Sequence, residues 1–191
     1  MRIHNGGKYE TEKDLKATRE HHPKAVAFKE PDHDKFAIIA NVGCILVVLL
    51  LGLVVYLLGD PNADGANSQL ELGIICGCLT IIPHEFLHAI CFREDAYIYS
   101  NPSKMLFFVH GTEDMSKNRF IFMSLLPNIV FGLIPYIVFL INPNLMFWGV
   151  FGALCLGMGF GDYCNVFFAT TQMPKGSKTY LSGFHSYWYK D

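Results

Sequence analysis

His84, Glu85 and His88 form the pattern His-Glu-x-x-His inside an otherwise apolar run of the sequence. Residues four apart on a helix lie one turn above the other, so the two imidazoles point the same way and can share one metal ion. Glu85 lies about 100° further round the helix than His84, close enough to reach a water on that metal. Two imidazole ligands, an open position for water and a carboxylate base are the parts of a zinc peptidase site. The motif therefore predicts Zn2+ as cofactor and Glu85 as the catalytic base.

The composition is that of a membrane protein. Hydrophobic residues make up 51% of the chain and charged residues only 17%, and the charge is concentrated at the N-terminus and between apolar runs. The net charge of -2 and the lack of a basic face argue against nucleic acid as a partner. A His, a Glu and a second His are costly in such an apolar setting and normally survive there only for function. The simpler alternative is a polar trio hydrogen-bonded to neighbouring helices.

Four apolar runs are long enough to cross about 30 Å of hydrocarbon as helices. They cover residues 36–58, 70–92, 120–141 and 145–168. The second run carries the motif, and Pro83 within it removes one backbone hydrogen bond, which predicts a kink just before the histidines. Residues 96–99 and 105–109 are rich in aromatic and branched side chains and flank a turn signature at 100–104. This pattern predicts a short β-hairpin.

The basic residues divide unevenly among the loops. All 15 Lys and Arg residues lie before the first run, between the second and third, or after the fourth. The positive-inside rule then places both termini and the hairpin in the cytoplasm. We expect an all-α integral membrane bundle in the cell membrane, with four transmembrane helices and a short cytoplasmic β-hairpin between helices 2 and 3. Residues 1–35 form a polar cytoplasmic segment, 36–168 the four-helix membrane domain with the metal site, and 169–191 a cytoplasmic tail.

The same topology brings the ionisable residues of the spans to one depth. His88 lies about 7.5 Å and Asp162 about 9 Å from the cytoplasmic ends of their helices. Apart from Cys, Tyr and the boundary residue Glu71, the ionisable side chains in the four runs are His84, Glu85, His88 and Asp162. These groups therefore converge on one candidate site.

The chain resembles the membrane-embedded zincins of the site-2 protease kind and, more closely, a small bacterial family described as putative zincin peptidases. The resemblance rests on residues 83–88, on Leu-Pro-Asn at 126–128 and on Gly-Asp at 161–162, and it covers most of residues 36–168. It implies a metal held by His84, His88 and Asp162, with Glu85 as the base. In site-2 proteases the aspartate usually precedes a glycine, whereas here the glycine precedes it.

The roles of Cys91, Asn128 and the hairpin each have an alternative interpretation. Cys91 lies three residues beyond His88 and is a weaker candidate than Asp162 for the third ligand. Asn128 could bind an unwound substrate strand or be a satisfied polar residue in a helix bundle. The hairpin could offer an edge to which an extended substrate adds, or lie on the membrane surface.

These observations together predict a membrane-embedded zinc metalloendopeptidase that hydrolyses peptide bonds of membrane-associated substrates. Its expected partners are a membrane protein or peptide substrate and the lipid bilayer. The alternative is a non-catalytic metal-binding membrane protein, such as an assembly factor or a transporter-like carrier. A metal site of that kind would gain little from the Glu85 carboxylate beside its ligands. A purely structural subunit of a membrane complex is a further alternative. Two His and one Asp suit zinc and also tolerate iron or cobalt.

Overall fold

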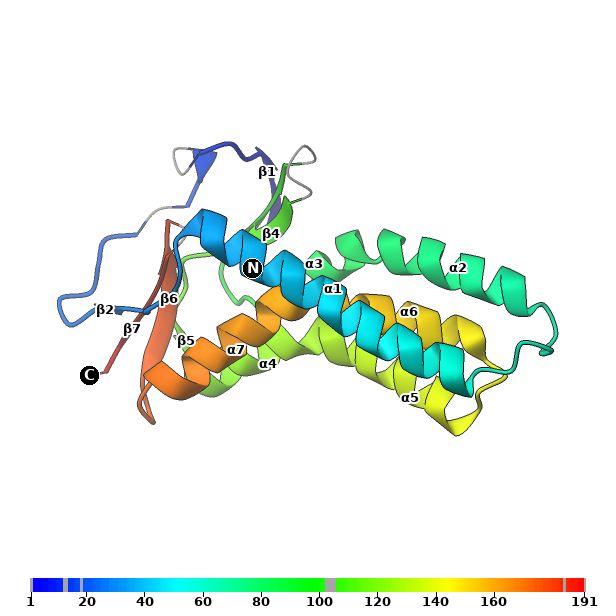
Figure 1. Ribbon diagram of the computed structural model, residues 1–191. Helices are drawn as coiled ribbons and strands as arrows, with labels where there is room; N and C mark the ends of the chain where they lie inside the picture. The colour runs from blue at the N-terminus through cyan, green and yellow to red at the C-terminus, as the bar shows by residue number, and fades with distance from the viewer. Residues whose placement is uncertain (1, 12–13, 18, 102–105, 184, 191) are drawn as a thin grey trace.

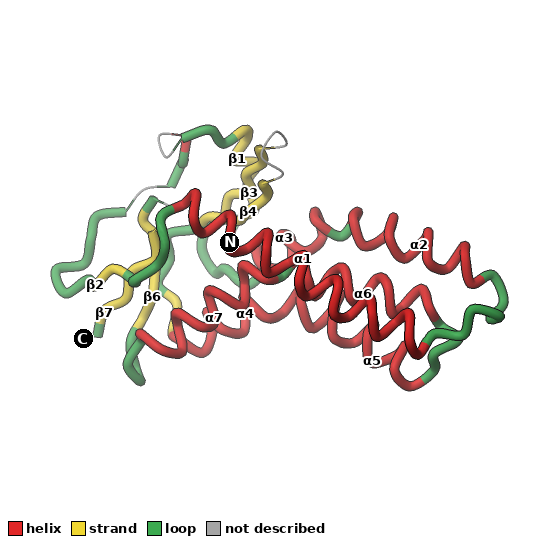
Figure 2. The backbone as a smooth tube through the Cα atoms, viewed as in Figure 1, coloured by secondary structure: helices red, strands yellow, loops and turns green. Residues whose placement is uncertain are grey.

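The computed structural model describes residues 2–11, 14–17, 19–101, 106–183 and 185–190. Figure 1 shows an elongated bundle of helices, with two small β-sheets gathered around one half of it. In Figure 2 the strands lie toward the end where the chain terminates, whereas loops alone join the helices at the opposite end. The bundle therefore has one bare end and one end that carries the sheets.

The first helix, α1 (His33–Leu58), runs along the outside of the bundle. It begins where the Asp32 side chain accepts a hydrogen bond from the Lys35 N–H at 3.1 Å, as an N-cap residue should. Its large apolar side chains are mostly exposed, among them Ile45, Leu46, Leu49, Leu50 and Leu53. An apolar surface of this kind suits contact with lipid.

The second apolar run forms two helices, α2 (Ala66–Leu79) and α3 (Ile81–Ala89), that meet at an angle of 42°. The break falls at Thr80, four residues before His84. Pro83 has no N–H to donate to the carbonyl four residues earlier, so the chain cannot continue one regular helix through this point. The predicted kink just before the histidines is confirmed.

The third run is one continuous helix over 25 residues whose middle changes geometry. It consists of α4 (Lys117–Pro127), the π-helix η3 (Asn128–Leu133) and α5 (Ile134–Ile141). Pro127 ends the α-helical part because it has no N–H for the carbonyl of Met123. Single π-turns inside α-helices are frequent at functional sites.

The fourth run is also divided, into α6 (Met146–Met158) and α7 (Phe160–Gln172), bent by 51° at Gly159. A Cβ atom on Gly152 of α6 would lie 2.7 and 2.8 Å from backbone atoms of α5 and η3. Glycine therefore lets α6 pack directly on the backbone of η3 and α5. The bend then turns α7 so that Asp162 lies in its first turn.

Two strands form the predicted hairpin between the second and third helical runs. β3 (Ala96–Asn101) and β4 (Leu106–His110) are antiparallel. Residues 102–104 of the predicted turn, and residue 105 of the predicted second strand, lie outside the described residues. The sheet has a third strand, β1 (Ile3–Lys8), which runs parallel to β3. The order β1-β3-β4 leaves β4 at an edge of the described sheet.

A second sheet has the strand order β2-β7-β6-β5. Its strands are β5 (Met115–Ser116), β6 (Lys178–Ser182), β7 (His185–Tyr189) and β2 (Val26–Ala27). The prediction of an all-α bundle with a single hairpin is therefore only partly confirmed: the helices and the hairpin are present, but the segments 1–35 and 169–191 both contribute further strands. These strands pair with partners far away in the sequence, so local patterns do not reveal them.

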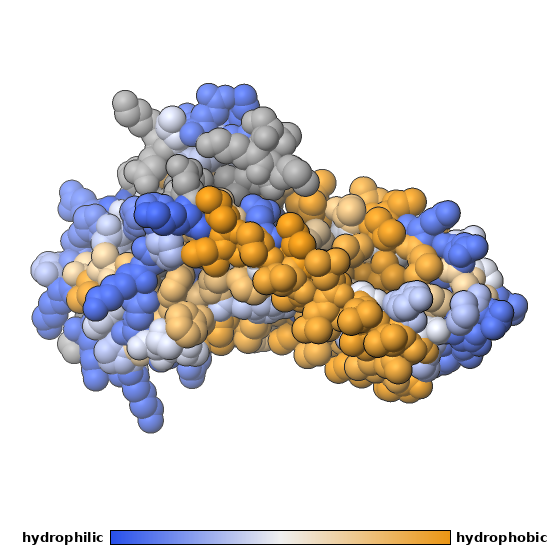
Figure 3. All heavy atoms as spheres, in the orientation of Figure 1, coloured by the Kyte–Doolittle hydropathy of each residue, from blue (hydrophilic) through white to orange (hydrophobic). Residues whose placement is uncertain are grey.

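Two helical segments in the described part of the chain are long and apolar enough to cross a membrane, Lys35–Leu58 and Lys117–Ile141. The two bent pairs, α2 with α3 and α6 with α7, raise this number to four if each pair is one span. Figure 3 shows a broad apolar band over the helices, with hydrophilic residues at both ends of the molecule. Length and composition are thus compatible with a membrane location.

Candidate metal centre

The two histidines of the motif lie side by side on α3 and are nearly buried. Their ring centroids are 4.9 Å apart, and each residue is 8% exposed. Asp162 reaches them from the first turn of α7. Its Oδ2 atom lies 3.1 Å from Nε2 of His84, and its Oδ1 atom lies 3.2 Å from Nε2 of His88. One carboxylate thus faces both imidazoles, although 74 residues separate Asp162 from His88 in the sequence.

Glu85 belongs to the same cluster. One potential ligand atom from each of His84, Glu85 and His88 lies within 4.8 Å of the others, a grouping that could hold a metal ion. The Glu85 carboxylate also accepts a hydrogen bond from the backbone N–H of Val109 on β4. The hairpin therefore reaches the site through the edge of β4.

The hydrogen bond of His88 determines which of its nitrogens is free. Its Nδ1 atom lies 2.9 Å from the carbonyl oxygen of Met123 on α4, and since a carbonyl only accepts, Nδ1 carries the proton. In a neutral imidazole, Nε2 then presents a lone pair to the Asp162 carboxylate at 3.2 Å. Two acceptors this close need a cation or a proton between them. The set of donor atoms fits a metal ion, and the Met123 carbonyl is the kind of outer partner that metal-binding histidines use.

Asn128 lies directly behind the aspartate. Its Nδ2 atom donates to Asp162 Oδ2 at 2.8 Å and to the Ser124 carbonyl at 3.1 Å. Asn128 is 2% exposed and is the first residue of η3. The amide hydrogens of Asn128 are thus directed to neighbours within the protein, and a direct role in binding substrate stays a prediction.

Cys91, the alternative third ligand, has a different neighbour. Its thiol, two residues past the end of α3, donates to the Leu87 carbonyl at 3.3 Å. The aspartate, not this thiol, provides the atoms that face the two imidazoles in the described structure.

Sequence reasoning did not identify Met123, Val109 or Gly159 as neighbours of the site. One signal for Met123 was present, because a proline four residues later leaves a helical carbonyl without its usual donor. The Val109 contact depends on how the hairpin packs against α3, and no local pattern indicates it.

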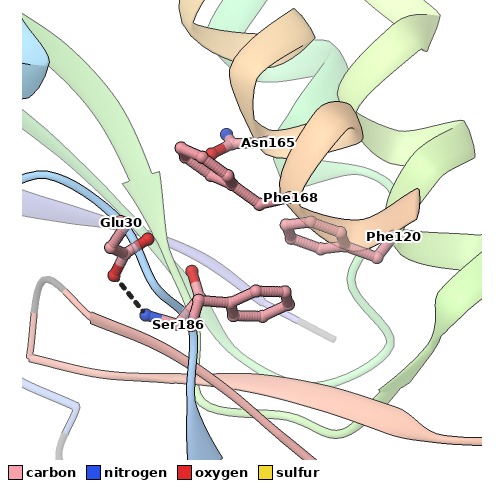
Figure 4. A pocket seen from close by; sticks show the side chains of 6 residues that line it. Glu30, Phe120, Asn165, Phe168 and Ser186 are labelled. Carbon is pink, nitrogen blue, oxygen red and sulfur yellow. Dashed lines mark hydrogen bonds between the residues drawn. The ribbon is translucent and has the colours of Figure 1, made fainter. Parts of the chain in front are cut away.

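The hollow drawn in Figure 4 lies away from this cluster, between the second sheet and helices α4 and α7. Glu30 points into it and accepts a hydrogen bond from the Ser186 N–H at 3.0 Å, with His185 at 3.2 Å. Burial raises the pKa of the Glu30 carboxyl above its ordinary value. Asn165 and Phe168 of α7 form the opposite wall. None of its lining residues belongs to the candidate metal centre.

The fold and the site together define a helical protein, with two to four candidate membrane spans, that holds a His-Glu-His cluster able to bind a metal ion. Residues 77–178, more than half of the chain, match the family described as "putative zincin peptidase". The chain therefore belongs to this family. The matched region contains α3, the hairpin and α4 to α7, and so includes every residue of the candidate centre. Searches of curated proteins and of solved structures gave no match.

Proposed function

We propose that the protein is a membrane-embedded zinc metallopeptidase that hydrolyses peptide bonds of membrane-associated substrates. The observation that carries this proposal is the meeting of both motif histidines with one distant carboxylate, that of Asp162, beside Glu85. Family membership supports the peptidase class. A third ligand from a distant helix is also the arrangement that the resemblance to site-2 proteases implies.

His84, His88 and Asp162 would hold the zinc ion. When bound, zinc is a Lewis acid that polarises a peptide carbonyl and lowers the pKa of a water molecule to about 7. The Met123 carbonyl keeps the His88 proton on Nδ1 and so leaves Nε2 free to bind the metal. A fixed tautomer of this kind favours metal binding at near-neutral pH.

Glu85 is the general base of the proposed mechanism. It accepts a proton from the attacking water and then delivers that proton to the leaving amine. Its position on the same helix as both histidines supports this role, because the carboxylate stays close to the metal ligands. Substitution of Glu85 by Gln should therefore preserve zinc binding and abolish hydrolysis.

The substrate is proposed to bind as an extended strand along the outer edge of β4. Val109 N–H is directed to Glu85 and not to β3, so the edge of the strand adjoins the proposed base. A peptide paired with this edge would bring its carbonyls to the centre. A helical substrate must first unwind locally, because its carbonyls are bonded within the helix. The exposed apolar helices and the distribution of Lys and Arg support a multi-pass orientation with both termini in the cytoplasm.

The test uses the full chain purified in detergent. We expect about one zinc ion per chain, lost in His84→Ala and Asp162→Ala. Cleavage of casein or of an apolar transmembrane peptide should disappear in Glu85→Gln, while Glu71→Gln, which changes a carboxylate outside the site, remains active. Zinc in the wild-type protein without any Glu85-dependent cleavage would support a metal-binding membrane protein instead. Folded protein without zinc would exclude both functions.

A further inference from the structure

We propose that Asn128 and Gly159 act as a pair that positions the Asp162 carboxylate toward the two histidines. The inference rests on the proposed metal site and assigns a role to two residues that do not bind the metal. Its basis is the packing of three helices, each of which departs from regular α-geometry at this point. α2 and α3 bend before His84, the π-helix begins at Asn128, and α6 and α7 bend at Gly159.

The Asn128 amide is a donor placed behind the carboxylate. Its Nδ2 atom lies 2.8 Å from Asp162 Oδ2, the same oxygen that faces His84. A second bond to the Ser124 carbonyl, 3.1 Å away, holds the amide in this orientation. The Asp162 carboxylate is thereby restrained from one side while both of its oxygens remain directed at imidazole nitrogens. An amide achieves this restraint without adding a positive charge that would compete with a cation.

The other end of the same amide has a cost that points to function. Asn128 Oδ1 is buried and has no hydrogen-bond partner among the described residues. A buried acceptor without a donor destabilises the folded state, and an apolar residue of similar size would avoid this. The Asn128 side chain therefore uses its N–H donor, while its buried oxygen has no hydrogen bond. We infer that the bond to Asp162 is the reason for an asparagine here.

Gly159 provides the space that the amide needs. A Cβ atom at this position would lie 1.5 Å from Asn128 Oδ1, 2.4 Å from its Cγ and 2.8 Å from its Nδ2. The backbone of Gly159 has φ of -75°, which any residue can adopt. Glycine is therefore required here by space and not by backbone conformation. All three of the nearest atoms belong to Asn128, so the two residues form one unit.

Because the three nearest atoms all belong to Asn128, a double-mutant cycle tests the pair directly. Zinc affinity is measured by competition with a chelator, and the visible spectrum of the cobalt-loaded protein reports the ligand arrangement. Asn128→Ala and Gly159→Ala should each weaken zinc binding about 10- to 100-fold, the usual loss when an outer-shell partner is removed. The double variant should bind zinc no more weakly than Asn128→Ala alone, because the three atoms that the added Cβ would clash with belong to the Asn128 amide and are then gone. Additive losses in the double variant would overturn the pairing.

Asn128→Leu separates the donor from simple packing. Leucine fills a similar volume but cannot donate, so zinc affinity should fall and the cobalt spectrum should change. Wild-type affinity in this variant would refute the role of the amide. This substitution also covers the case in which the alanine variant fails to fold.

Two substitutions serve as matched controls. Asn101→Ala removes another buried amide, which donates to the Tyr9 carbonyl at 2.7 Å in the first sheet. Gly161→Ala adds a Cβ next to Asp162 where, apart from its chain neighbours and the backbone of its own helix, no described atom lies within 4 Å. Both should retain wild-type zinc affinity, and thermal unfolding of the metal-free proteins reports any general loss of stability.

Zinc affinity and hydrolysis separate this inference from the proposed function. A protein that shows the predicted coupling but cleaves no peptide supports the positioning pair and refutes the peptidase. Cleavage that depends on Glu85, together with unchanged zinc affinity in Asn128→Leu, supports the peptidase and refutes the pair.

Discussion

His88 donates from Nδ1 to the carbonyl oxygen of Met123 at 2.9 Å. That carbonyl is free because Pro127, four residues later, has no N–H to satisfy it. A proline in one helical segment thus frees the carbonyl that orients a motif histidine on another helix.

Pro127→Ala should therefore weaken zinc binding while leaving the helix at least as stable. The new N–H would compete with His88 for the Met123 carbonyl, and loss of such an outer partner typically costs about 10-fold or more in metal affinity. Chelator competition measures the affinity, and thermal unfolding of the metal-free protein measures stability. Pro135→Ala, in the same helical span, is the control and should bind zinc normally. Equal affinity in Pro127→Ala and wild type would show that the freed carbonyl is not needed.

Removal of the metal should lower stability and abolish cleavage together. A ligand present at 100 times its Kd stabilises the native state by about 2.7 kcal/mol, so the thermal midpoint should fall when a chelator is added. Restoring zinc should return both the midpoint and the activity. Asp162→Asn should show the low midpoint with or without zinc, since it has lost one of the proposed ligands. A thermal midpoint of the wild-type protein that does not change with zinc would contradict the proposed metal site.

Val109→Pro tests the proposed substrate edge. Proline removes the N–H that faces Glu85 but leaves the pairing with β3 largely intact, because that N–H is not directed to β3. Cleavage should fall about 10-fold while zinc affinity is unchanged, because the proposed base Glu85 loses its hydrogen bond from the β4 edge, and a hydrogen bond to a charged group contributes about 1.5–3 kcal/mol. Val109→Ala retains the N–H and should remain active. Full activity in the proline variant would show that the edge of β4 at Val109 is not needed for cleavage.

His110 should make the stability of the protein sensitive to acid. It is buried at the end of β4, and burial lowers its pKa from the ordinary value of 6.5. Below pH 6.5 the unfolded chain binds a proton at this residue before the folded protein does, so the free energy of unfolding decreases as the pH falls toward the folded pKa. Above pH 6.5 the effect is absent.

Thermal unfolding between about pH 5 and pH 8 measures this dependence. His110→Gln should flatten the curve on its acid side, because glutamine does not titrate in this range. A steep acid loss that persists in His110→Gln would assign the effect to another group.

Patterns that repeat within a short stretch of sequence predicted much of the architecture. Apolar runs indicated the helical spans, Pro83 indicated the bend before His84, and alternating aromatic and branched residues indicated the β3–β4 hairpin. Each of these depends on contacts between residues close in the chain, for which spacing alone carries the physical information. The spacing of His84, Glu85 and His88 likewise determined that their side chains would share one helix face.

Only the tertiary structure decided what surrounds that motif. The parallel pairing of β1 with β3 and the donation from Asn128 to Asp162 join segments whose own patterns give no sign of a partner. The space left by Gly159 accommodates the Asn128 side chain only because η3 packs against the bend between α6 and α7. Contacts of this kind depend on how whole helices and strands pack. The sequence by itself therefore determined the chemical groups and their local geometry, while long-range packing decided which carbonyl, amide and strand edge would orient them.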